Sequence, residues 1–162
     1  GADVNRPATY GIRRTPLQLA IENGSQDIVQ YLLDRGADIN AFPAFTTGAT
    51  ALQLATIKGY TGFGELLLTC GADVNAARAR RKGRTTFEGA AEHGRLDMLL
   101  LLQRWDVDIV SDGGEQYRNA VQFAKKNRQL AAARLVEMLY QAALNKSLRL
   151  SMVVKHHRGD HK

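Results

Sequence analysis

The sequence predicts an all-α solenoid in which short helix–turn–helix units stack side by side. Three features recur every 35 residues. They are an Asp at positions 3, 38, 73 and 108, a Thr at positions 15, 50 and 85, and a Gly nine residues after each Thr. A fixed period of this length is typical of repeat arrays, whose units bury their apolar faces only by stacking on their neighbours.

Each recurring Thr is expected to begin the first helix of a unit. Its hydroxyl can accept a hydrogen bond from a free backbone N–H, and the residue three positions later can return one. That residue is Gln18, Gln53 or Glu88. Pro16 stands at the first helical position, where its missing N–H costs nothing. The Gly that follows, at Gly24, Gly59 or Gly94, predicts a left-handed turn that ends the helix.

A second helix is expected in each unit, over residues 25–35, 60–70 and 95–104. In the first of them Ile28, Val29, Leu32 and Leu33 form one apolar stripe. The second contains Gly62 and Gly64, which should each cost roughly 1 kcal/mol relative to Ala. We therefore expect the middle unit to be the least stable.

The repeated text resembles the signature of the ankyrin repeat family. The matching strings are Thr15-Pro16-Leu17-Gln18-Leu19-Ala20, then Ile28-Val29, then Gly36-Ala37-Asp38-Ile39-Asn40. The resemblance covers roughly 140 of the 162 residues, weakens after Ala76 and is faint from Glu115. It implies an ankyrin repeat solenoid with projecting β-hairpin-like fingers. Gln18, Gln53 and Glu88 replace the family's usual His, so the hydrogen bonds that the His makes between repeats are left open.

The period is longer than the family's common value of about 33, and the extra residues lengthen the fingers. Such arrays are similar to those near the ends of large fungal proteins. The expected boundaries are the end of a truncated repeat with the first finger at 1–14, ankyrin repeats at 15–49, 50–84 and 85–118, a divergent capping repeat at 119–150 and a disordered basic tail at 151–162. We expect Arg128 to take the place of a turn glycine and residues 129–150 to form the capping helix. This organisation indicates part of a larger protein.

The composition and the motifs argue against several classes of function. The net charge is +6, and no apolar run approaches the roughly 20 residues that span a bilayer. A single cysteine, Cys70, cannot form an internal disulfide and favours a reducing compartment, so we expect an intracellular protein, cytoplasmic or nuclear. The sequence shows no nucleophile elbow, phosphate loop or zinc-ligand pair. We expect no enzyme activity, no catalytic residue, no cofactor, no metal site, no small-molecule substrate and no membrane contact.

The fingers carry the strongest charge pattern. Arg78, Arg80, Arg81, Lys82 and Arg84 lie in the third finger, Arg6, Arg13 and Arg14 in the first, and Phe42 and Phe45 in the second. One interpretation is a basic rim with an aromatic centre that receives an acidic protein partner, because Arg and exposed rings are favoured binding anchors. The other interpretation is an ordinary solvated loop.

The resemblance also implies that finger tips and the exposed ends of the first helices form one concave contact surface. The candidate partner-binding residues are Arg13, Arg14, Glu22, Asn23, Phe42, Phe45, Ala49, Ile57, Lys58, Arg78, Arg80, Arg81, Arg84, Glu92 and His93. The favoured function is a non-catalytic protein–protein interaction module. The alternative is a structural or autoregulatory array that packs on its own parent chain. A nucleic-acid surface is less favoured, because acidic residues interrupt the basic ones.

Overall fold

The computed structural model describes residues 3–8, 14–44 and 48–159, with side chains through Met152. The described residues form eight helices. They are α1 (Pro16–Glu22), α2 (Gln26–Asp34), α3 (Ala51–Lys58), α4 (Thr61–Thr69), α5 (Thr86–Glu92), α6 (Leu96–Arg104), α7 (Glu115–Lys126) and α8 (Leu130–Gly159).

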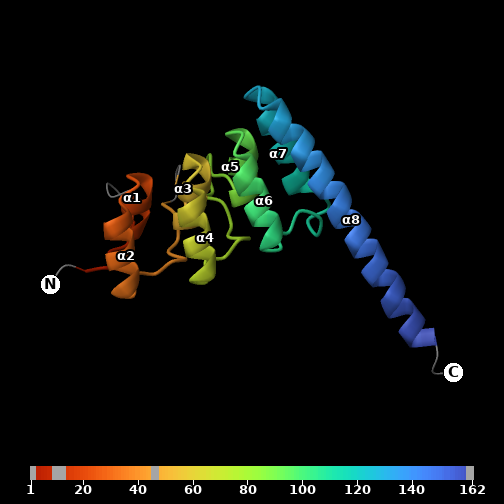
Figure 1. Ribbon diagram of the computed structural model, residues 1–162, viewed down its shortest axis with the longest axis horizontal. Coiled ribbons are helices and arrows are strands. Elements are labelled where there is room, and N and C mark those ends of the chain that lie inside the picture. The colour runs from red at the N-terminus through yellow and green to blue at the C-terminus, as the bar shows by residue number, and fades with distance from the viewer. Residues whose placement is uncertain (1–2, 9–13, 45–47, 160–162) are drawn as a thin grey trace.

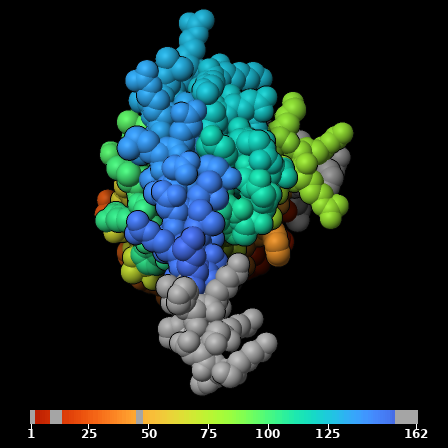
Figure 2. All heavy atoms as spheres, turned by 90° about the vertical axis from the view of Figure 1, so that its right-hand side faces the viewer, coloured from red at the N-terminus to blue at the C-terminus, as the bar shows by residue number. Residues whose placement is uncertain are grey.

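The helices are arranged in pairs along one axis (Figure 1). α1, α3, α5 and α7 pack on one another in order, and each also packs on the second helix of its own pair. The last pair, α7 and α8, covers the C-terminal end of the array, which faces the viewer in Figure 2. The predicted all-α ankyrin-type solenoid is therefore confirmed.

The three predicted capping boxes are all present. Thr15, Thr50 and Thr85 each accept from the backbone N–H three residues later, while the side chain of that residue accepts from the backbone N–H of the Thr. Each exchange satisfies two backbone donors that a helix start would otherwise leave unpaired. The helix ends also agree, because Gly24, Gly59 and Gly94 adopt φ values of 69°, 75° and 66°.

One continuous core runs through the stack. The position after Pro16 is filled in turn by Leu17, Leu52 and Phe87, and all three side chains are buried. At the far end the core is completed by small residues of the last pair, including Ala120, Ala124, Ala132 and Ala133. These small side chains let α7 and α8 approach the third helix pair closely.

Gly62 and Gly64 in α4 differ in the space around them. A Cβ on Gly62 would meet no atom within 4 Å, so this glycine is a pure cost in helix propensity. A Cβ on Gly64 would lie 3.0 Å from Cε of Met98 and 3.2 Å from Cδ2 of Leu101. Gly64 therefore permits close packing of α4 on α6, which offsets its intrinsic cost.

The C-terminal region differs from the expected boundaries. α7 already begins at Glu115, so the boundary expected after residue 118 falls inside this helix. The side chain of Asp112 starts α7 by accepting from the N–H of Gln116 at 2.8 Å. Arg128, expected in the place of a turn glycine, has a left-handed φ of 59°.

The prediction of a disordered tail from residue 151 is wrong for residues 151–159, because α8 continues to Gly159. No glycine or proline interrupts the chain between Leu130 and Arg158, so nothing local ends the helix earlier. In Figure 1 the later part of α8 extends beyond the helix pairs. Residues 160–162 lie outside the described part of the chain.

Candidate functional site

Pairs of Arg and Glu side chains bridge the base of a finger and the end of a first helix. Arg14 donates to Glu22 through Nε and Nη2, both at 3.2 Å. Arg84 donates to Glu92 in the same way, at 2.8 and 3.1 Å. Two parallel bonds of this kind fix both side chains. The candidate residues of repeats one and three are thus held by each other.

Repeat two replaces this charged pair with an apolar one, Ala49 and Ile57. Ala49 is buried and Ile57 is half-buried. The Ile57 side chain packs toward the next repeat, where a Cβ on Gly89 would lie 3.2 Å from its Cγ1. The guanidinium of Arg84 also lies 3.9 Å from the ring centre of Phe123 in α7. Ile57 and Arg84, two of the predicted contact residues, therefore each pack against the following helix pair.

An asparagine ladder joins the bases of successive fingers. Asn40 donates to the carbonyl of Gly71 at 3.0 Å and accepts from the N–H of Asp73 at 2.8 Å. Asn5 makes the same two bonds one repeat earlier, and Asn75 accepts from the N–H of Asp108 one repeat later. Each amide satisfies backbone groups of the following repeat and so fixes the spacing of the fingers.

Gln18 and Gln53 also connect neighbouring repeats. The Gln18 amide donates to the carbonyl of Ala41, and the Gln53 amide donates to the carbonyls of Ala76 and Ala77, at 3.1–3.2 Å. The hydrogen bonds between repeats that the family's usual His would make are thus supplied here by glutamine. The oxygen of each amide completes the capping box while its nitrogen reaches the next finger.

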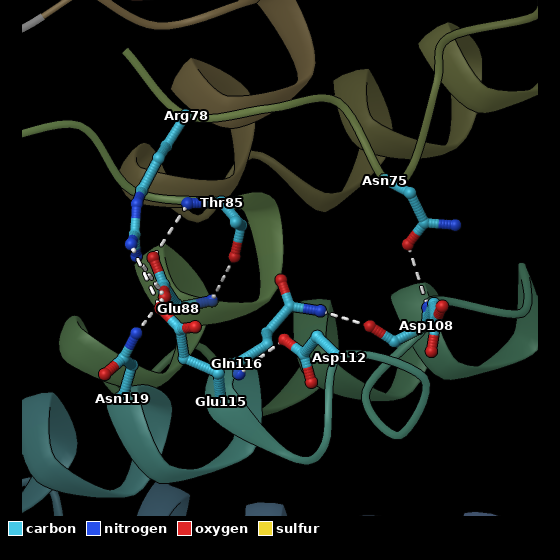
Figure 3. A pocket seen from close by; sticks show the side chains of 9 residues that line it. All are labelled: Asn75, Arg78, Thr85, Glu88, Asp108, Asp112, Glu115, Gln116 and Asn119. Atoms are coloured by element: carbon cyan, nitrogen blue, oxygen red, sulfur yellow. Dashed lines mark hydrogen bonds and ion pairs between the residues drawn. The ribbon is translucent and has the colours of Figure 1, made fainter. Parts of the chain in front are cut away.

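Glu88 occupies the same position in repeat three, but a carboxylate cannot donate. It is 1% exposed and accepts from Arg78 at 2.8 Å and from Asn119 of α7 at 3.0 Å. Figure 3 shows Arg78 reaching Glu88 from the finger and Asn119 reaching it from the opposite side. Arg78 also lies 3.5 Å from Glu115. At this position Gln18 and Gln53 bind the next finger, whereas Glu88 binds Arg78 and Asn119 of α7 and so helps to attach the last helix pair, α7 and α8, which is called the cap below.

The surrounding hollow has a volume of about 280 Å³ and is lined mainly by polar residues. Its acidic side chains serve internal bonds. Asp108 accepts from the N–H of Val110. Asp112 accepts from the N–H of Gln116 at the start of α7, and the Gln116 side chain donates to the carbonyl of Asp108 (Figure 3). Among the described residues, no group of three or more His, Cys, Asp and Glu could hold a metal ion. The hollow is an interface between the third finger, its repeat and the cap.

The tip of the third finger is a tight turn. A Cβ on Gly83 would lie 2.4 Å from the backbone N of Ala79, so the backbone at Gly83 lies directly against the backbone at Ala79. The second finger has the same geometry, with Gly48 against the backbone of Ala44. The described finger residues form no extended strand, although Arg81 is in an isolated β-bridge.

Arg80, Arg81 and Lys82 lie between the touching residues of the third finger. All three are exposed, and Lys82 has a left-handed φ of 55°. Arg80 and Arg81 make no ion pair or hydrogen bond with any described side chain. Figure 2 shows this part of the chain, in lime green, projecting from the body of the array.

A groove separates the second and third fingers and has a volume of about 640 Å³. The ring of Phe42 is 90% exposed beside it, the highest value among the large apolar side chains that the structure describes. The groove lining comprises Asn40, Phe42, Pro43, Thr50, Asp73, Ala76, Ala77, Arg78, Ala79 and Arg80.

Comparison with known families agrees with this geometry. Residues 1–78 match the family model described as ankyrin repeats (3 copies). These residues are ankyrin repeats. The same capping box and helix pair continue through α5 and α6, so the ankyrin array extends past the matched residues. The chain matches none of the curated proteins significantly. None of the described helices is long and apolar enough to cross a membrane.

The ankyrin array leaves several predicted contact residues open to solvent. Asn23, Lys58 and His93 are exposed at the ends of the first helices, and the ring nitrogen Nδ1 of His93 lies 3.1 Å from the carbonyl of Gly89. Arg13 and Phe45 lie outside the described residues. Whether any of the candidate residues contacts a partner stays a prediction.

Sequence reasoning missed the internal roles of the charged residues. Arg14 and Glu22 are eight residues apart, and so are Arg84 and Glu92. Their repetition at one spacing, together with the apolar pair in repeat two, was a signal of pairing. Asn119 gave no such signal, because it lies 31 residues from Glu88 in the region where the repeat text has faded.

Proposed function

We propose that this chain is a non-catalytic protein–protein interaction module that holds its partner through the finger tips and the adjoining ends of the first helices. Ankyrin repeats generally bind proteins and are typically non-catalytic. The observation that carries the proposal is the exposed tip of the third finger, where Arg80 and Arg81 have no partner among the described residues. Exposed arginines on a rigid turn are suited to partner recognition. We place the module inside the cell, in keeping with its single free cysteine, Cys70.

Partner capture tests this function. The 162-residue chain is immobilised, nuclease-treated cell extract is passed over it, and retained proteins are identified by mass spectrometry. The Arg80→Glu, Arg81→Glu variant should lose the specific partner while its thermal melt stays unchanged. The control variant Lys126→Glu, Arg134→Glu changes the net charge equally at exposed positions of α7 and α8. It should retain the partner.

Purified partner then gives the quantitative test by calorimetry. Equal binding to the wild-type chain and to the Arg80→Glu, Arg81→Glu variant would exclude the finger tip as the contact surface. If no protein from the extract is retained and no purified protein binds, that result favours the second candidate function.

The second candidate is an array that packs on its own parent chain, and exposed apolar side chains on α1 and α2 support it. Leu19 is 49% exposed, whereas Leu54 at the same position of repeat two is 4% exposed. Ile28 and Tyr31 are also more than half exposed, while their counterparts in repeat three are fully buried. In the third repeat these positions lie on α6, which packs on α4 of the preceding pair, and Leu54 lies on α3, which packs on α1. A further helix pair of the parent chain is the occupant that fits this face.

Hydrogen exchange distinguishes this candidate. In the full natural polypeptide the amides of α1 and α2 should exchange more slowly than in the 162-residue chain, because covering the end face suppresses local opening. Tyr31→Glu should destabilise the full polypeptide more than the shorter chain. Equal exchange in both proteins would contradict packing of this face on the parent chain.

A further inference from the structure

We infer that the groove between the second and third fingers receives an extended acidic segment of the partner, with one apolar side chain of that segment resting on Phe42. This inference rests on the proposed function and specifies the chemistry of the partner. It depends on three properties of the groove: an exposed apolar wall, unpaired positive charge at one end, and a framework that is already rigid.

The apolar wall lies at the base of the groove. Phe42 follows the ladder residue Asn40 by two positions, and its ring is almost fully exposed. Pro43 continues this wall, and small side chains, Ala76, Ala77 and Ala79, line the groove with it. Small side chains leave the space open, and an apolar residue placed there would remove the ring from water.

The unpaired positive charge lies at the finger tip. Arg80 lines the groove and Arg81 follows it, and neither has a partner among the described side chains. Two other arginines of the same finger, Arg78 and Arg84, are bound to glutamates. Free charge in the third finger is thus concentrated at its tip, where acidic residues of a partner are attracted without displacing an internal ion pair.

Asp73 gives the bound segment a direction. This carboxylate lines the base of the groove and accepts from the N–H of Asn75 at 2.8 Å. A ligand carboxylate beside it would meet like charge, whereas an apolar side chain would not. Acidic residues of the segment therefore lie toward Arg80 and Arg81, and the apolar residue lies toward Phe42.

The groove is held open before a ligand arrives. Asn40 links the bases of the two fingers through its bonds to Gly71 and Asp73. Gln53 ties the second repeat to the carbonyls of Ala76 and Ala77 on the groove wall. A preformed site reduces the ordering cost of binding. A short segment can then bind without a large interface.

Peptide selection tests this chemistry directly. A phage-displayed library of short random peptides is selected on the wild-type chain. Enriched peptides should contain acidic residues next to one large apolar residue. By fluorescence anisotropy, a synthetic enriched peptide should bind about tenfold more weakly to the Arg80→Glu, Arg81→Glu variant and more weakly at high salt. Phe42→Ala should weaken it severalfold, and replacing the apolar residue of the peptide by Ala should then cause no further loss.

The control variant Lys126→Glu, Arg134→Glu should bind the peptide as the wild type does. Enriched peptides without acidic residues, or binding unaffected by the tip reversal, would overturn the inference. So would single-stranded DNA that binds through Arg80 and Arg81 more tightly than any selected peptide. Failure to enrich any peptide, while the intact partner is still captured through the tip, would overturn the inference and leave the proposed function standing.

Discussion

The ion pair between Arg78 and Glu88 gives the sharpest test of how the cap is attached. Arg78→Ala removes a donor 2.8 Å from a carboxylate that is 1% exposed. Asn119 and the N–H of Thr85 remain as neutral donors, at 3.0 and 3.1 Å. Glu88 thus stays hydrogen-bonded but loses its opposite charge.

The magnitude follows from burial. Hydrogen bonds to charged groups contribute about 1.5–3 kcal/mol, and breaking a buried ion pair costs about 3–5 kcal/mol. The Arg78 side chain is 42% exposed, so solvent screens its charge and places the loss at the lower end of these ranges. We expect Arg78→Ala to lower the free energy of unfolding by about 2 kcal/mol.

Urea unfolding followed by circular dichroism measures this loss. Arg80→Ala is the matched control, because Arg80 lies in the same finger without a partner and should change stability by less than about 0.5 kcal/mol. Adding Glu88→Gln to Arg78→Ala removes the unpaired charge, so the double variant should lose less than the sum of the single losses. If Arg78→Ala were no worse than Arg80→Ala, the ion pair would not secure the cap.

Two glycine predictions use close contacts of the backbone. Gly62→Ala should raise the free energy of unfolding in urea by up to about 1 kcal/mol, because the added Cβ meets nothing within 4 Å. Gly64→Ala should not raise it, because the added Cβ would lie 3.0 Å from Met98. An equal gain in both variants would contradict the packing assigned to Gly64. Gly83→Ala should disturb the finger tip, because its Cβ would lie 2.4 Å from the backbone of Ala79. It should weaken capture of the partner with little change in the circular dichroism of the helices, and unchanged capture would count against a fixed tip.

Part of the fold was predictable because its signals are local. Thr15 and Gln18 are three residues apart, and their exchange of hydrogen bonds depends on one helical turn. Gly24 ends the first helix because of its own backbone freedom. Repetition of these short patterns at one spacing then predicted the stacking.

The candidate site was less predictable for the same reason. The charge of the third finger was visible in the sequence, but its division into paired and unpaired arginines was not. Arg78 forms an ion pair with Glu88, ten residues away in the sequence, whereas Arg80 pairs with no described side chain. Both arginines lie in the same short loop. That difference depends on the path of the finger, which Gly83 and Ala79 close at the tip.

The sequence by itself determined the period, the capping boxes, the left-handed turns and the basic third finger, because each depends on residues within a few positions of one another. Only the tertiary structure decided the partners of Glu88, the packing role of Gly64 and the groove beside Phe42. These features require side chains from different repeats to meet. The distance between repeats in space is set by the stacking of the whole array.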